Sequence, residues 1–160
     1  MTKASPMKYI LLFLPLFFFF SSYSQQYRPA SSDEIYKEIK MLKNLPRVLY
    51  LAAHPDDENT RLISWLANEK LMNAGYLSLT RGDGGQNLIG PEIGPYLGVI
   101  RTQELLQARK IDRGQQFFSS AKDFGFSKNP EETFNIWNRE KVLSDMVWVI
   151  RSFRPDVLNT

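Results

Sequence analysis

Six consecutive apolar residues, Val48 to Ala53, constrain the fold of this chain more than any other part of it. The run lacks polar alternation, which is typical of a strand buried on both faces of a parallel sheet. An apolar helical stripe over residues 62–67 follows, and residues 76–79 form a second short run after Gly75. Strand, helix and strand in this order make a βαβ unit, so we predict an α/β fold with a mainly parallel sheet.

Further helices and strands continue this pattern to the end of the chain. We predict helices over about 97–111 and 138–153 and strands over 115–118 and 156–158, separated by a long loop (80–98) and an irregular segment (119–136). The ligand site of an open α/β sheet lies at the carboxyl ends of its strands. Because the chain stops directly after the fourth strand, we expect a sheet truncated there, in a fragment of a longer protein. The alternative is a short domain that ends on its last strand.

The first residues, 1–24, have the layout of a secretory signal peptide. Lys3 and Lys8 precede an apolar stretch over residues 9–20, and small residues lie before Gln25. We predict cleavage after residue 24 and export to the periplasm or the exterior. A retained membrane anchor is the alternative, although a spanning helix needs about 20 apolar residues.

A helical lead-in is expected over residues 25–45. Ser31 and Glu34 have the spacing of a capping box, and Pro46 ends the apolar stripe that follows them. The remaining residues, 46–160, are then the N-terminal part of one α/β domain.

Charge and cysteine content exclude several classes of protein. The chain has no cysteine, which excludes a disulfide scaffold, a thiol nucleophile and a lipidated cysteine. Its formal net charge of +3 depends largely on the two lysines of the predicted signal peptide, and no basic patch with interleaved aromatic residues remains without them. We therefore expect no nucleic-acid partner, and no membrane span after signal cleavage. No sequence feature indicates an oligomeric state.

Residues with chemical potential gather in His54-Pro55-Asp56-Asp57-Glu58, directly after the first predicted strand. If this segment begins the next helix, His54 and Asp57 face the same side of it. An imidazole nitrogen and a carboxylate oxygen are common zinc ligands, and Asp56 could act as a general base on water. The segment also fits a plain helix start, with proline in first position and acids in the first turn. The residues alone leave both interpretations open.

The same segment resembles a known family. Ala53–Glu58 is similar to the AHPDDE signature of the LmbE-like, or PIG-L-type, N-acetylglucosaminyl deacetylases. Weaker similarities to this family are a glycine-containing loop at 79–85, an R-x-x-E…A helix at 101–108 and the lead into the fourth strand at 154–157. The resemblance covers about residues 46–160.

The resemblance implies a Rossmann-like three-layer sandwich and a zinc-dependent hydrolase that deacetylates an N-acetylated sugar or glycoconjugate. It makes His54 and Asp57 ligands of Zn²⁺ and Asp56 the general base. The zinc ion would polarise the acetamide carbonyl and lower the pKa of its water. The family's third ligand and its oxyanion-assisting residue are later histidines. Since His54 is the one histidine here, we expect the third ligand beyond residue 160, and poor metal binding and no activity in residues 1–160 alone.

Two other functions remain open. One is a catalytically inactive carbohydrate-binding module on the same fold. The other is a metal-free protein in which the acids after the first strand only cap a helix.

Substrate contacts are expected from two segments. Arg81 and Asp83 lie in the glycine-containing loop and could form a wall of the pocket, although simple turn chemistry explains its glycines equally well. By resemblance, Arg101 reaches sugar hydroxyls. Alternatively it pairs with Glu104, an acid that interrupts an apolar helical stripe and therefore needs a partner.

Three tryptophans could stack on a sugar ring. Trp65 and Trp148 lie in predicted helices and are expected in the core, whereas Trp137 lies beside the irregular segment and is the better candidate.

Overall fold

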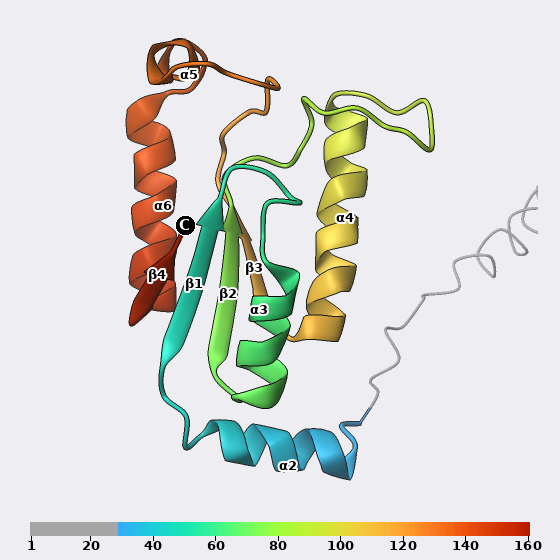
Figure 1. The fold of residues 1–160 in the computed structure, drawn as a ribbon, viewed down its shortest axis with the longest axis vertical. Helices are drawn as coiled ribbons and strands as arrows, with labels where there is room; N and C mark the ends of the chain where they lie inside the picture. The colour runs from blue at the N-terminus through green and yellow to red at the C-terminus, as the bar shows by residue number, and fades with distance from the viewer. Residues whose placement is uncertain (1–28) are drawn as a thin grey trace, which may run out of the picture. The chain divides into compact units, whose positions relative to one another are not determined.

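The structure, a computed structural model, describes residues 29–160, so the predicted signal peptide lies outside the described residues. In chain order its elements are α2 (Ser32–Met41), β1 (Arg47–Ala52), α3 (Thr60–Ser64), the π-helical turn η1 (Trp65–Glu69), β2 (Asn73–Ser78), α4 (Pro95–Asp112), β3 (Gln115–Phe118), α5 (Pro130–Ile136), α6 (Arg139–Phe153) and β4 (Val157–Asn159). The four strands pair in parallel in the order β3-β2-β1-β4 (Figure 1). In residues 29–160, no helix has the length and apolar character needed to span a membrane.

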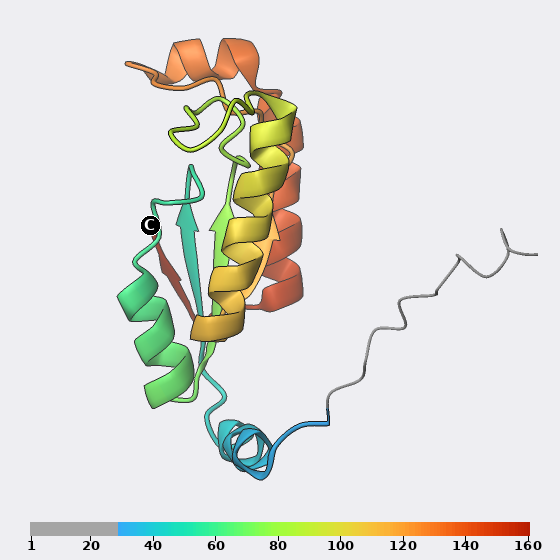
Figure 2. The same cartoon turned by 90° about the vertical axis from the view of Figure 1, so that its right-hand side faces the viewer.

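Helices cover both faces of this sheet, which confirms the predicted three-layer α/β fold (Figures 1 and 2). On one face α3, η1 and α4 pack against the strands, and on the other face α6 does so. Strand β1 shows why its sequence has no polar alternation. Val48 and Tyr50 pack into the core under α3 and α4, whereas Leu49 and Leu51 pack into the core under α6.

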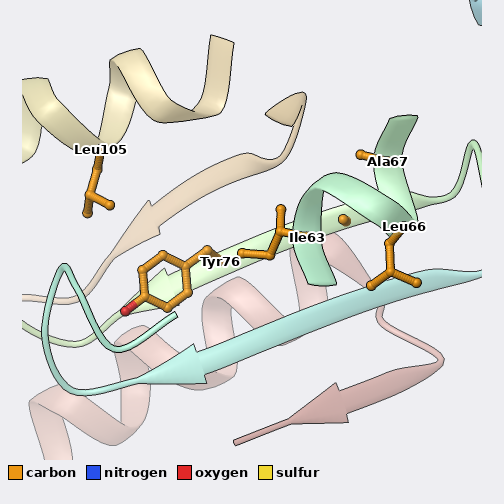
Figure 3. Packing of buried hydrophobic residues seen from close by; sticks show 6 residues of the cluster. Ile63, Leu66, Ala67, Tyr76 and Leu105 are labelled. Carbon is orange, nitrogen blue, oxygen red and sulfur yellow. The ribbon is translucent and has the colours of Figure 1, made fainter. Parts of the chain in front are cut away.

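The first core joins three elements around Tyr76 of β2 (Figure 3). Ile63 and Leu66 reach it from α3 and η1, and Leu105 reaches it from α4. The Tyr76 side chain is fully buried, and its hydroxyl points toward the loop that leaves β1. This core therefore holds a polar group next to the segment that carries His54.

The second core depends on a close approach of α6 to the sheet. Phe153 of α6 packs on Leu49 and Leu77. A Cβ added to Gly75 would lie 3.1 Å from Cζ of Phe153, so the missing side chain of Gly75 leaves room for that ring.

The strand order places the end of β1 at a change of direction in the sheet. From β1 the chain moves outward through β2 to β3, and after α6 it returns to pair β4 with the opposite side of β1. In open α/β sheets, ligands bind outside the carboxyl ends of the strands at such a switch point. The residues that follow β1 therefore lie where this fold places ligand sites.

Two local predictions were wrong. The segment 119–136 is not wholly irregular, because it contains α5, whose N-cap Asn129 accepts a hydrogen bond from the Glu132 amide at 2.9 Å. The helix after β1 does not start at Pro55 but at Thr60.

Candidate active site

The segment between β1 and α3 is a turn rather than the first turn of a helix. Asn59 is the N-cap of α3, where its Oδ1 accepts a hydrogen bond from the Leu62 amide at 3.0 Å. The amide of Asp57 donates to the carbonyl of His54 at 3.3 Å, which closes the turn. The acids at 56 and 57 therefore precede the helix, and the interpretation that they only form its first turn loses its structural basis.

The turn nevertheless brings together the two side chains that the spacing paired. Nδ1 of His54 lies 3.2 Å from Oδ2 of Asp57. The same carboxylate oxygen accepts a hydrogen bond from the His54 amide at 2.9 Å. The Asp57 carboxylate thus stabilises the turn through the His54 amide and also places an oxygen beside the His54 imidazole.

Asp123 is a third polar residue of this site that no sequence pattern predicted. Its Oδ1 lies 3.6 Å from Nε2 of His54, and its side chain is only 4% exposed. The amide of Gly125 donates to this oxygen at 2.9 Å, and the amide of Asp123 donates to Oδ1 of Asp83 at 3.3 Å. The only sequence indication was its place after the third strand, since the ends of parallel strands meet at one edge of a sheet.

Asp56, the predicted general base, is held by a residue of α4. Its side chain is 71% exposed, and Oδ1 lies 3.2 Å from Nη2 of Arg101. Nε of Arg101 lies 3.6 Å from Oε2 of Glu104, so the expected pairing of these two residues is present. Arg101 therefore bridges the turn after β1 and the exposed surface of α4.

Glu104 does not interrupt a buried apolar face, which corrects the expectation for this helix. Its side chain is exposed. The buried residues of α4 are Leu97, Gly98, Leu105, Arg109 and Asp112.

A cavity of about 550 Å³ collects these side chains at the ends of β1, β2 and β3. It is lined by His54, Asp56, Asp57, Gly82, Gly85, Gln86, Leu88, Arg101, Asp123, Gly125 and Phe126. The cavity thus combines an imidazole, three carboxylates and one guanidinium with an apolar rim.

Arg81 and Asp83 line a neighbouring cavity of about 460 Å³ instead. Nη1 of Arg81 donates to Oγ1 of Thr102 at 3.0 Å, and its guanidinium lies 4.3 Å from the ring centroid of Phe118. Through its bond with the Asp123 amide, Asp83 connects the walls of the two cavities.

The tryptophans are placed differently from the expectation. Trp65 and Trp148 are 48% and 65% exposed, so their assignment to the core was wrong. Trp137 donates from Nε1 to the carbonyl of Lys122 at 2.7 Å, and its ring meets that of Phe124 edge-on. It lies beside the loop that carries Asp123 but does not line the cavity around His54.

The described residues offer two metal donors rather than a complete metal site. A catalytic zinc ion typically has three protein ligands. Within residues 29–160, no group of three or more histidine, cysteine, aspartate or glutamate side chains could hold a metal ion. His54 and Asp57 are donors of the kind that zinc accepts, and they lie 3.2 Å apart.

Comparison with known proteins gives the family and the fold. Residues 49–160 match the family PIG-L, described as GlcNAc-PI de-N-acetylase. GalB, the 4-carboxy-2-hydroxymuconate hydratase of Pseudomonas putida KT2440, shares the fold at 18% identity and a TM-score of 0.53, over 71% of this chain and 46% of that one. The N,N'-diacetylchitobiose deacetylase of Pyrococcus horikoshii does so at 16% identity and a TM-score of 0.52, over 82% of this chain and 50% of that one.

The chain spans about half the length of these two structures, and no curated protein matches its sequence. At such identities the two structures establish the Rossmann-like fold alone. The family match covers most of the described chain and confirms the resemblance carried by Ala53–Glu58. The chain belongs to the PIG-L family of GlcNAc-PI de-N-acetylases.

Proposed function

We propose that this chain is part of a hydrolase that removes the acetyl group from an N-acetylated sugar of the N-acetylglucosamine type. The observation that carries the proposal is the convergence of His54 and Asp57 within 3.2 Å, with Asp56 in the same cavity, inside the segment that matches PIG-L. The family description and the Pyrococcus deacetylase both name substrates that contain N-acetylglucosamine, which supports this substrate class.

We propose Zn²⁺ as the cofactor, held by His54 and Asp57 and by a histidine beyond residue 160. When bound, the ion would supply a Lewis acid that polarises the amide carbonyl and lowers the pKa of a nearby water. The chemistry of the two donors supports this choice, since imidazole and carboxylate are both zinc ligands.

Asp56 is the proposed general base. Its exposed carboxylate takes a proton from the attacking water and passes it to the nitrogen as the C–N bond breaks, which yields acetate and a free amine. Arg101 orients that carboxylate from 3.2 Å, and its other N–H groups can donate to sugar hydroxyls in the cavity. Arg81 and Asp83, in the neighbouring cavity, would bind parts of the glycoconjugate farther from the acetamide.

The test is acetate release by the full-length protein from N-acetylglucosamine, N,N'-diacetylchitobiose and GlcNAc-PI. We expect release from at least one of them, its loss with a chelator, and its return when Zn²⁺ is added. Activity that persists after verified removal of the metal would contradict the zinc proposal. Binding of these sugars without any acetate release would favour the inactive carbohydrate-binding module. The hydratase that shares this fold is an example of one fold with different activities.

Export is part of the same proposal. If residues 1–24 direct secretion, the substrate is an envelope or extracellular glycan. Recovery of the mature protein from the periplasm or the medium, with an N-terminus at Gln25, would support it.

A further inference from the structure

Glu58, the last residue of the AHPDDE segment, is buried in a charged cluster that the proposed chemistry does not use. Its side chain is 4% exposed, and Oε1 lies 3.2 Å from Nη2 of Arg109, whose side chain is 5% exposed. The same guanidinium contacts Oδ2 of Asp112 at 2.6 Å and donates from Nη1 to Oε1 of Gln116 at 3.2 Å. One arginine of α4 therefore connects the turn after β1 with the end of α4 and with β3.

The cluster is not arranged for maximal stability. Two carboxylates share one guanidinium, and Oε2 of Glu58 is buried without a hydrogen-bond partner among the described residues. Burial raises the pKa of Glu58, against the opposing influence of Arg109. Buried ion pairs often stabilise a fold no better than apolar side chains of similar size would. Stability alone therefore does not explain why this charged cluster is buried here.

A second anchor joins the other end of the turn to the same cluster. The hydroxyl of Tyr76 donates to the carbonyl of His54, and burial raises the pKa of this tyrosine hydroxyl. The guanidinium of Arg109 lies 5.7 Å from the centroid of the Tyr76 ring. The turn is thus held at its first residue through Tyr76 and at its last through Arg109.

We propose that Glu58 is a positioning residue: its ion pair with Arg109, together with the bond from Tyr76 to His54, fixes the turn so that His54 and Asp57 converge. This inference rests on the proposed function, since that function is what requires His54 and Asp57 to converge. Neither Glu58 nor Arg109 lines the cavity around His54, so both act through the backbone of the turn. Within the turn, hydrogen bonds join His54 with Asp57 and the Glu58 carbonyl with the Thr60 amide. The contacts of Arg109 and Tyr76 tie this turn to the core.

The test compares Glu58→Gln with Glu69→Gln in the full-length protein. Glu69 is an exposed acid on the neighbouring η1, so its variant makes the same change of charge away from the cluster. One readout is the pair of ring-proton NMR resonances of His54, assigned by their loss in His54→Asn. The other is Zn²⁺ affinity, measured by competition with a chromophoric chelator.

In Glu58→Gln, we expect the His54 resonances to move toward unfolded-peptide values and the zinc affinity to fall by about 10- to 100-fold, the usual effect of losing a partner that orients a ligand. Glu69→Gln should change neither. A folded Glu58→Gln protein with unchanged His54 resonances and unchanged zinc affinity overturns the proposal.

Two further variants separate positioning from general stability. Val149→Ala weakens the core under α6, on the other face of the sheet, without touching the cluster or Tyr76. If it displaced the His54 resonances as much as Glu58→Gln does, the proposal would be wrong. If Glu58→Gln does not fold, Tyr76→Phe decides, because it removes the hydroxyl that donates to the His54 carbonyl and keeps the buried ring. Displaced resonances support the proposal and unchanged ones overturn it. If the wild type binds no zinc, the metal assignment fails, and the NMR readout still decides the positioning role.

Discussion

Nε2 of His54 lies 3.6 Å from Oδ1 of Asp123, a buried carboxylate that enters the site from the loop after β3. On the other side of the same ring, Nδ1 faces Asp57. The imidazole therefore lies between carboxylates from two different strand ends. With Asp57 as the proposed ligand, Asp123 is the outer partner, and a carboxylate in that place fixes the orientation of a ligating histidine.

This arrangement predicts that Asp123→Ala lowers kcat/KM by at least about tenfold, the order of effect seen when a ligand's orienting partner is removed. The substitution removes the contact with Nε2 and leaves the amide of Gly125 without its acceptor. Kinetics of acetate release by the full-length variant provide the measurement. Asp33→Ala, at an exposed acid of α2, is the control, and equal kcat/KM in both variants would contradict the prediction.

Asp56→Asn should abolish most turnover while zinc remains bound. The amide keeps the shape of the side chain but cannot accept the proton, and loss of a general base typically costs about 10²- to 10⁴-fold in rate. Since Asp56 is exposed, stability should change by less than about 0.5 kcal/mol. Metal analysis and kcat on one preparation measure both effects. Undiminished deacetylation would remove Asp56 from the role of base.

Burial on both faces explains why the sheet could be predicted from the sequence. An apolar run such as Val48 to Ala53 fits few environments other than a central parallel strand, and the predicted strand matches β1 within a residue at each end. The proximity of His54 and Asp57 was also predicted, but from a helix that does not exist there. Pro55 is as suitable for a turn as for a helix start. In the structure the helix begins at Thr60, with Asn59 as its N-cap.

The buried charged residues around the site could not be predicted, because apolar periodicity in a sequence does not indicate which charged side chains are buried. The buried face of α4 contains Arg109 and Asp112, so the apolar stripe in its sequence falls on the face with Glu104 instead. Asp123 and Glu58 are buried against distant segments. The loops after β1 and β2 meet Asp123, and helix α4 meets Glu58. A single sequence contains no spacing that pairs residues so far apart.

Asn59→Ala should lower the free energy of unfolding by about 1 kcal/mol, because the amide of Leu62 loses its capping acceptor at the start of α3. Asn59→Ser keeps an acceptor at this position and should be close to the wild type. Urea unfolding of the three proteins compares them directly. An equal loss in both variants would mean that the asparagine acts through something other than the cap.

Gly84→Ala should destabilise the loop that carries Asp123. A Cβ at Gly84 would lie 2.7 Å from the carbonyl carbon and oxygen of Asp123, which are backbone atoms that cannot rotate away. Overpacking of this kind costs about 1–3 kcal/mol. At Gly85 the nearest atom is the carbonyl oxygen of Gly82 at 3.3 Å, so Gly85→Ala is a matched control with a smaller expected cost. Urea unfolding measures both, and a larger loss in Gly85→Ala would contradict the prediction.

The contact of α6 with the loop after β3 should weaken in acid. Oδ2 of Asp145 accepts hydrogen bonds from Oγ of Ser120 at 2.5 Å and from its amide at 2.8 Å, and these bonds lower the pKa of Asp145 below its ordinary value of 3.8. A carboxyl group whose pKa is lower in the folded state binds fewer protons there than in the unfolded state. Its contribution to stability is therefore present above the ordinary pKa and is lost as the pH falls through the lowered one.

Asp145→Asn isolates this contribution, because the amide keeps a neutral acceptor for Ser120 but carries no charge. We expect the wild type to be more stable than the variant at pH 7, and the difference to shrink as the pH falls from about 5 to below 3. Urea unfolding of both proteins at pH 7, 5 and 3 measures this difference. Asp33→Asn, with the same loss of charge at an exposed position on α2, is the control for general charge effects. A difference between wild type and Asp145→Asn that stays constant over this range would show that the contact contributes through shape rather than through its charge.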